Sequence, residues 1–344
     1  MIDFRYHLVS IVAVFLALAI GIVLGSTELQ GPAYNLLDKT TSKLQNELGQ
    51  VSSQRDTAQQ QATEGEMYAQ AVEPTVLHDL LVGQRLLIVT EPGAQSSVVS
   101  GISSAALAAG ASITGQVNLA TKFFDTSGTA QDGLNQTTLD VAQAAGLSLD
   151  SSATYQQQAA QVIASEILAK APASSTGKPP ADQATEASTM LQAYAASQFL
   201  STTGQPANPA TLVVVVTPQT PPSDGSADQL DQVLVPLVTE LAAKSSATVV
   251  AGSSAGTGAG SPIAVLRSNN ISSQVSTVDD ADLVAGQTVA MQALAVGLAG
   301  GKAGSYGFAA NGASAIAPSP APTPSVSASA TSSSSSSTKK KVKK

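Results

Sequence analysis

A serine flanked by glycines is the pattern with the most specific chemistry in this chain. Residues 252–256 read GSSAG, which fits the Gly-x-Ser-x-Gly turn of hydrolases and places Ser254 directly after a predicted strand. In that fold the histidine base follows the serine in the sequence. The chain has two histidines, His7 and His78, and both precede the serine. The pattern therefore favours a turn of small residues. No catalytic residue is predicted, and the chain is not expected to be an enzyme.

Alternating glycines give a second candidate, a nucleotide-binding turn. Gly256, Gly258 and Gly260 are followed by Asp279 and Asp280, about 20 residues on, where an acid that binds a ribose would lie. The spacing is Gly-x-Gly-x-Gly, however, and the glycines do not follow the first predicted strand, as the dinucleotide motif requires. A bound nucleotide is therefore not predicted.

Residues that could bind a metal are sparse. Copper prefers Cys, Met or His ligands, and the chain has no cysteine. Beyond the first segment, the soft side chains lie far apart in the sequence: His78, Met67, Met190 and Met291. Asp279, Asp280 and Asp282 could hold a hard cation, but a solvated acidic turn before a helix explains them more simply. No cofactor is predicted, and metal ligands stay unassigned.

The first predicted element of the chain is a membrane anchor over residues 1–27. Residues 8–24 read LVSIVAVFLALAIGIVL, and a bilayer core about 30 Å thick requires about 20 such residues in a helix. The side chains assigned to the anchor are Leu8, Phe15, Leu16 and Leu24. The alternative is a cleaved signal peptide, whose apolar core is usually shorter, about 7–15 residues.

Charges beside the anchor bear on its orientation. Arg5 favours a cytoplasmic N-terminus, whereas Lys39 and Lys43 favour the opposite direction. Because a leader of six or seven residues is easily left inside, we expect a single pass through the cell membrane. The C-terminal domain would then lie outside the cytoplasm.

Residues 28–73 are predicted to form a coiled-coil stalk. Gly31-Pro32 should separate it from the anchor, and Glu73-Pro74 should end it. Between them, apolar residues recur at the 3-4 spacing of a heptad, which favours a homodimer. The predicted dimer seam consists of Leu37, Leu44, Leu48 and Val51. A single solvated helix, or one packed on the globular domain, is the alternative.

Residues 74–312 are predicted to form an α/β domain. Near-continuous apolar strands indicate a parallel sheet buried on both faces; they lie at 85–93, 211–218 and 247–253. We expect a Rossmann-like or flavodoxin-like three-layer domain with a mainly parallel sheet. A helical insertion is predicted near 119–209, and a short edge strand at 273–280. A helix is predicted at about 281–299, and residues 283–301 are uncharged, which favours a core helix over a second membrane span.

The composition of the C-terminal segment and the net charge of the whole chain indicate which kinds of partner the protein could bind. Residues 313–344 are rich in Ser, Pro and Ala and end in KKKVKK, a composition typical of disorder. The lysines could bind anionic lipid or wall polymer, or simply keep the tail soluble. The net charge is −8, which argues against nucleic acid as a partner.

Several stretches resemble the actinobacterial copper transporter family typified by MctB. The similarity covers the start MIDFRYHLVSIVAVFLALAIGIVLGS, the strands GQRLLIVTEP and TLVVVVTP, and the end VDDADLVAGQTVAMQALAVGLAGGKAGSYGFAANGA. Its most specific parts are Arg5-x-His7 and the VDD helix followed by Gly304, Tyr306 and Gly307.

The resemblance implies a non-enzymatic role in copper homeostasis or efflux at the cell envelope, with copper as the only implied ligand. Some relatives are described instead as partners of a membrane division protein that influence cell-wall separation. The alternative is therefore a dimeric coiled-coil scaffold that binds a membrane protein. No binding residue can be carried over by motif.

Overall fold

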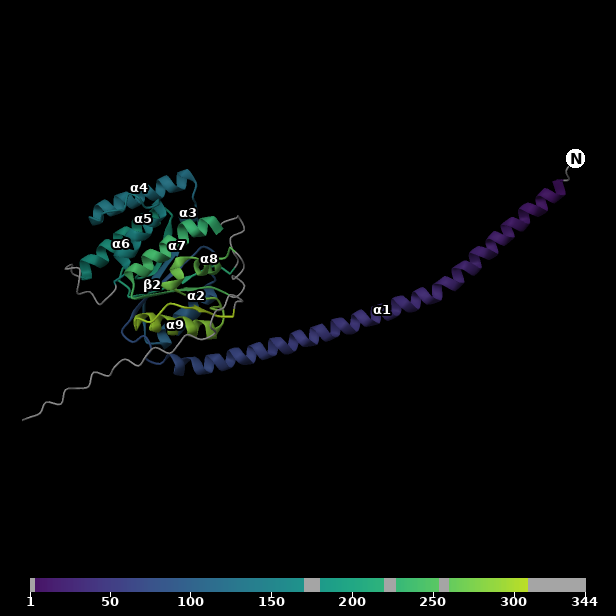
Figure 1. The fold of residues 1–344 in the computed structure, drawn as a ribbon, viewed down its shortest axis with the longest axis horizontal. Coiled ribbons are helices and arrows are strands. Elements are labelled where there is room, and N and C mark those ends of the chain that lie inside the picture. Colours follow the sequence, from purple (N-terminus) through teal and green to yellow (C-terminus); the bar gives the residue numbers. More distant parts are fainter. Residues whose placement is uncertain (1–3, 170–179, 220–226, 254–259, 309–344) are drawn as a thin grey trace, which may run out of the picture. The chain divides into compact units, whose positions relative to one another are not determined.

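The computed structural model describes residues 4–169, 180–219, 227–253 and 260–308. The chain divides into two units, Met1–Met67 and Tyr68–Lys344. The first unit consists of most of one long helix, and the second holds the sheet with its covering helices (Figure 1). Each unit is described by itself below.

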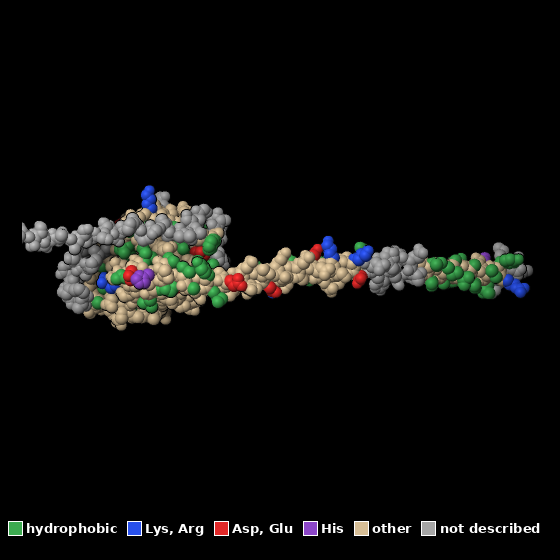
Figure 2. Space-filling view, turned by 90° about the horizontal axis from the view of Figure 1, so that it is seen from below, with side chains coloured by type: hydrophobic (Ala, Val, Ile, Leu, Met, Phe, Trp, Pro, Cys, Tyr) green, Lys and Arg blue, Asp and Glu red, His purple; other side chains and the backbone are tan. Residues whose placement is uncertain are grey.

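The helix α1 runs without interruption over Phe4–Leu77, a length of 74 residues. The predicted breaks at Gly31-Pro32 and at Glu73-Pro74 are therefore wrong. A proline removes one backbone donor and bends a helix, but the turns on either side keep their own hydrogen bonds. Figure 2 shows hydrophobic side chains gathered at the N-terminal end of this helix, with mainly polar side chains further along it.

A seven-stranded sheet forms the centre of the second unit, in the order β3-β2-β1-β4-β5-β6-β7. Its strands are β1 (Arg85–Thr90), β2 (Ser112–Leu119), β3 (Leu200–Gly204), β4 (Leu212–Val216), β5 (Ala247–Ala251), β6 (Ser276–Val278) and β7 (Ser305–Tyr306). All neighbours are parallel except β3, which runs antiparallel to β2. The expected α/β class with a mainly parallel sheet is confirmed.

Two strands of this sheet differ from expectation. The segment 273–280 was expected at the edge, but β7 pairs outside β6, so that prediction is wrong. The strand β3 lies in the segment 119–209, where only helices were expected. Both strands are short, and β3 reads LSTTG, so neither carries the apolar run that marks the central strands.

Helices cover both faces of the sheet. They are α2 (Ser96–Ala108), α3 (Thr121–Phe124), α4 (Gly128–Ala145), α5 (Tyr155–Ile167), α6 (Pro180–Ala196), α7 (Ala227–Lys244), α8 (Pro262–Ser268), the 3-10 helix η2 (Asn270–Ser273) and α9 (Val284–Leu298). In Figure 1, α2 and α9 lie on one side of the strands, and α4 to α8 lie on the other.

The alternation of side chains in β1 explains this layering. Leu87 and Val89 join the core on the side of α5 and α7, while Leu86 and Ile88 join the core on the side of α2 and α9. All four are buried. Burying such a side chain contributes about 1.5–3 kcal/mol, and a strand buried on both faces therefore reads as continuously apolar.

The helix α9 packs as a core helix. Ala290, Met291 and Leu294 are buried in the same cluster as Leu86 and Ile88. The expectation of a core helix in this segment is confirmed. The helix has 15 residues, fewer than a membrane span needs.

Candidate functional site

One stretch in the described part of the chain is long and apolar enough to cross a membrane, Arg5–Gly25 in α1. Its 21 residues are exposed in the single chain, as an apolar helix facing lipid would be. The exposed fractions are 56% for Leu8, 66% for Phe15, 61% for Leu16 and 60% for Leu24. The stretch thus meets the length and composition of a span, and these properties are shared with signal sequences.

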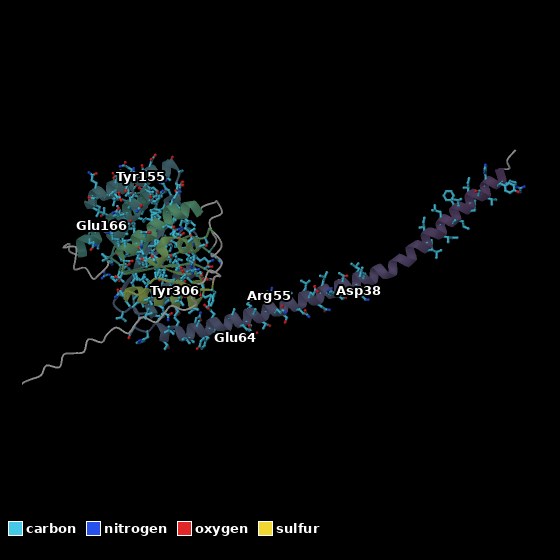
Figure 3. The ribbon with its side chains drawn as sticks, viewed as in Figure 1. Asp38, Arg55, Glu64, Tyr155, Glu166 and Tyr306 are labelled. Atoms are coloured by element: carbon cyan, nitrogen blue, oxygen red, sulfur yellow. The ribbon has the colours of Figure 1, made fainter. Side chains whose placement is uncertain are left out.

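The residues of the predicted dimer seam lie further along the same helix. They remain exposed in the single chain, at 63% for Leu37, 54% for Leu44, 69% for Leu48 and 62% for Val51. Charged side chains are spaced along this part of α1, where Figure 3 labels Asp38, Arg55 and Glu64. Lys43 and Glu47 form an ion pair of 3.7 Å one turn apart.

The residues considered for hydrolysis do not assemble into a described site. Ser254, Gly256 and Gly258 lie outside the described residues. His78 directly follows α1, and its Nδ1 lies 3.1 Å from Oδ2 of Asp79. Both of these side chains are more than 70% exposed, so the pair is a surface contact.

The candidate soft metal ligands are separated. Met67 is exposed, whereas Met190 and Met291 are buried in the core clusters on opposite faces of the sheet. In the part of the chain that the structure describes, no three His, Asp or Glu side chains are placed to hold a metal ion.

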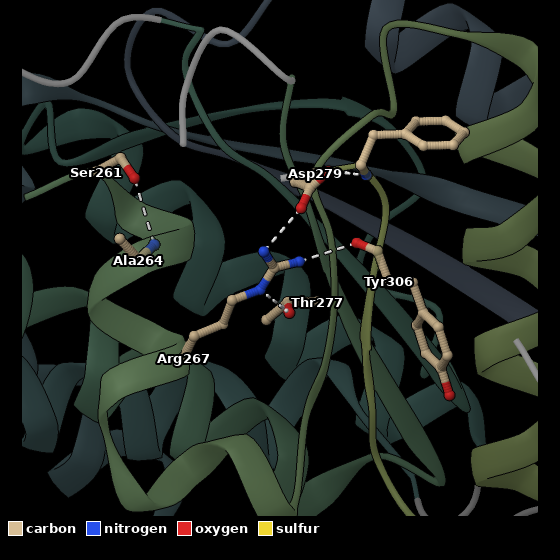
Figure 4. A network of polar contacts seen from close by, with 7 residues as sticks. Ser261, Ala264, Arg267, Thr277, Asp279 and Tyr306 are labelled. Atoms are coloured by element: carbon tan, nitrogen blue, oxygen red, sulfur yellow. Dashed lines mark hydrogen bonds and ion pairs between the residues drawn. The ribbon is translucent and has the colours of Figure 1, made fainter. Parts of the chain in front are cut away.

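A buried ion pair joins α8 to the last two strands (Figure 4). Nη1 of Arg267 lies 2.7 Å from Oδ2 of Asp279, and the two side chains are 8% and 0% exposed. The same guanidinium donates from Nε to Oγ1 of Thr277 and from Nη2 to the carbonyl of Tyr306, each at 2.9 Å. Oδ1 of Asp279 accepts from the amide of Phe308 at 2.9 Å. We call these residues the Arg267 clamp.

The expected solvated acidic turn is wrong for two of its three aspartates. Asp279 and Asp280 are 0% and 1% exposed, because Arg267 neutralises the first and glycines let the backbone close over both. A Cβ at Gly307 would lie 1.9 Å from Oδ1 of Asp279, and one at Gly286 would lie 2.0 Å from the carbonyl of Asp280.

Burial has an electrostatic consequence at Asp280. Burial, and then the charge of Asp279, raises the pKa of Asp280 to about 6. Its Oδ1 has no hydrogen-bond partner among the described residues. The VDD sequence therefore serves to lock β6, β7 and the start of α9 together, and it offers no open coordination site.

The structure also reveals a buried acid that the sequence reasoning missed. Glu91 follows β1, is 4% exposed, and has no hydrogen-bond partner at Oε1 in the described chain. Burial raises its pKa to about 8. Its amide donates to the carbonyl of Val216 at 3.0 Å, so Glu91 lies where β1 and β4 end side by side. An acid directly after an apolar strand was the available signal.

Two neighbouring features mark this edge of the sheet. The connection from β1 leads to β2 on one side, and the chain later returns to β4 on the other side, an arrangement at which α/β sheets often bind ligands. A groove of about 570 Å³ lies between α2 and the ends of β1 and β2, with Thr90, Ser100, Gln116 and Asn118 in its lining. We call it the α2 groove.

The family match and the individual relatives found by comparison with known proteins carry the same name. The family described as "Copper transport outer membrane protein, MctB" matches residues 1–318. The protein named "Copper transporter MctB" in Mycobacterium tuberculosis (strain ATCC 25618 / H37Rv) is 28% identical over 312 residues, which cover 89% of this chain and 96% of that protein. The protein of the same name in Mycobacterium leprae (strain TN) is 26% identical over 324 residues, covering 92% and 100%.

Proposed function

Since the chain belongs to the MctB family of copper transport proteins, we propose that it works at a membrane in copper homeostasis, as a component of copper export or tolerance. The match over residues 1–318 is the observation that carries this proposal. The apolar stretch Arg5–Gly25 supports a single-pass anchor in the cell membrane.

Copper is proposed here as cargo, handled without catalysis. Soft ligands suit copper, and the described methionines that could supply them are separated by the sheet or lie on α1. We infer that one chain by itself does not complete a copper site, and that the protein handles copper after assembly with other subunits. Among the described residues, no three His, Asp or Glu side chains are placed to hold a metal ion either.

A deletion strain tests the copper role. Loss of the gene should raise the copper content of cells grown in excess copper and lower the copper concentration that stops growth. The full chain should restore both, and a Leu16→Arg variant, whose charge disfavours a membrane span, should not. Unchanged copper content in the deletion strain would overturn the proposal.

We also propose an architecture for the whole chain. Five of the parallel strands follow the order β2-β1-β4-β5-β6, which corresponds to the order of flavodoxin-like sheets and supports that class, and β7 adds one more parallel strand beyond β6. The exposed apolar seam on α1 supports a parallel coiled coil between two copies. A dimeric scaffold that binds a membrane partner, for example in division or wall separation, is the second candidate.

Disulfide trapping tests the dimer without any background reaction, because the natural chain has no cysteine. Leu44 occupies a seam position of the heptad, and Asn46 lies on its outer face. The Leu44→Cys variant should form a disulfide-linked dimer in membranes under mild oxidation, whereas Asn46→Cys should not. Equal trapping of both variants, or trapping of neither, would contradict the coiled-coil dimer.

A further inference from the structure

The α2 groove has the size of a ligand site and an unusual lining. Seven of its nine lining residues carry a hydroxyl or a side-chain amide, the other two are Ala94 and Val99, and none is ionisable. Its volume of about 570 Å³ lies within the range of small-molecule sites, about 300–1,000 Å³. The groove opens at the carboxyl ends of parallel strands, where such sites form.

The described residues of this lining carry no charge, which disfavours several ligand classes. A phosphate or nucleotide would find no Arg or Lys among these residues to balance its charge, and only the backbone amides of the first turn of α2 could bind it. A site for a hard cation would need carboxylates. The groove is therefore suited to an uncharged polar ligand.

On the strand side, the groove presents hydrogen-bond donors. The Oγ1 hydroxyl of Thr90 donates to Oδ1 of Asn118 at 2.8 Å. This bond fixes the orientation of the amide and leaves the two protons of Asn118 Nδ2 for a ligand. Gln116 adds a second amide beside it.

On the helix side, the groove presents acceptors. The hydroxyl of Ser103 donates to the carbonyl of Val99 at 2.7 Å, and that of Ser104 donates to the carbonyl of Ser100 at 3.0 Å. Because each proton is used within the helix, the oxygen lone pairs face outward as acceptors. The strand wall thus offers donors to a ligand, and the helix wall offers acceptors.

We propose that the α2 groove binds a neutral saccharide. A sugar hydroxyl both accepts and donates, so adjacent hydroxyls can accept from Asn118 while donating to the serines. Val99 supplies apolar contact for the C–H face of the ring. Beyond Asn118 and Gln116, the sheet continues with their register partners Ser201 and Thr203, which are exposed and extend the polar surface for further units of a chain.

The test is a titration of the full chain in lauryldimethylamine oxide, a detergent without a sugar head group. Glucose, N-acetylglucosamine, cellotriose and chitotriose are added, and binding is followed by calorimetry and ligand-observed NMR. We expect a dissociation constant of about 1 mM or tighter for at least one of them. The trisaccharides should bind at least as well as the single sugars.

Two variants locate the site. Asn118→Leu should weaken binding at least tenfold. Ser104→Arg fills the groove from an exposed helix position that tolerates arginine well, and it should abolish binding even if Asn118→Leu proves unstable. Ser112→Ala, at the exposed start of β2, is the matched control and should bind as the natural chain does.

Three results would overturn the proposal. These are absence of binding for all four sugars up to roughly 10 mM, ten times the expected constant; binding that Ser104→Arg leaves unchanged; and binding of inorganic phosphate in the groove. None of them bears on the copper phenotype of the deletion strain, so the saccharide site and the proposed function fail separately.

Discussion

At the scale of single residues, Glu91 is the group whose protonation should govern the stability of the second unit. Burial raises its pKa from 4.5 to about 8, so it is mostly protonated at pH 7. The folded state then binds more protons than the unfolded state between these two values. Stability must fall as the pH rises through this window.

The expected result is a thermal unfolding midpoint that decreases between pH 5 and pH 8 and then levels off. One pKa unit corresponds to about 1.4 kcal/mol, so the total effect is at most several kcal/mol. Glu91→Gln stays neutral and keeps a similar shape, and it should remove most of the decrease above pH 6. A smaller decrease below pH 6 should remain, because the pKa of Asp280 is raised to about 6. An identical pH profile for the variant and the natural chain would contradict this account.

The Arg267 clamp leads to a second prediction at this scale. Removal of one partner of a buried ion pair leaves an uncompensated charge and typically costs about 3–5 kcal/mol. We expect Arg267→Leu to lower the free energy of unfolding by this amount, measured by thermal or denaturant unfolding. The double variant Arg267→Leu with Asp279→Leu removes both charges and should recover part of the loss. A single variant as stable as the natural chain would show that the pair is not buried in solution.

At the scale of elements, the start of α9 depends on a close approach that only glycine allows. A Cβ at Gly286 would lie 2.0 Å from the carbonyl of Asp280. Gly286→Ala should therefore lower the unfolding midpoint by several degrees, since the clash is with backbone that cannot move aside. Gly128 begins α4 with no atom near its would-be Cβ, so Gly128→Ala is the matched control and should be neutral or slightly stabilising. Equal effects of both substitutions would refute the close approach.

The sequence predicted the central elements because their signals are local. β4 reads LVVVV and is buried at every position, and Ser261-Pro262 begins α8 with the serine hydroxyl accepting from the amide of Ala264 at 3.3 Å, as a capped helix start should. The polar strand β3 and the two-residue β7 were missed, because pairing with neighbours far along the chain stabilises them and no local pattern does.

The site was less predictable for the same reason. The partner of Asp279 is Arg267, twelve positions earlier, and its burial depends on β7 lying beside β6. Nothing in the local sequence around the two aspartates distinguishes a buried clamp from a solvated turn. Likewise, Glu91 is buried where β1 and β4 end side by side, and its amide bonds to the carbonyl of Val216, a residue far away in the sequence.

At the scale of the whole molecule, the chain combines one apolar helical stretch with a separate α/β unit. A cytoplasmic N-terminus would place the α2 groove and the acidic second unit outside the cytoplasm. The opposite orientation would present them to cytosolic partners. The orientation therefore decides which saccharides and which copper pool the second unit can meet.

Single cysteines in this cysteine-free chain can report the orientation directly. Lys302 is exposed in the second unit, and Asp3 precedes the apolar stretch without contributing to its positive charge. In intact spheroplasts, a membrane-impermeant maleimide should label Lys302→Cys at once, while Asp3→Cys should react only after lysis. Labelling of Asp3→Cys alone would reverse the orientation. Recovery of the labelled Lys302→Cys chain in the medium, shortened at its N-terminus, would indicate a cleaved signal peptide in place of an anchor.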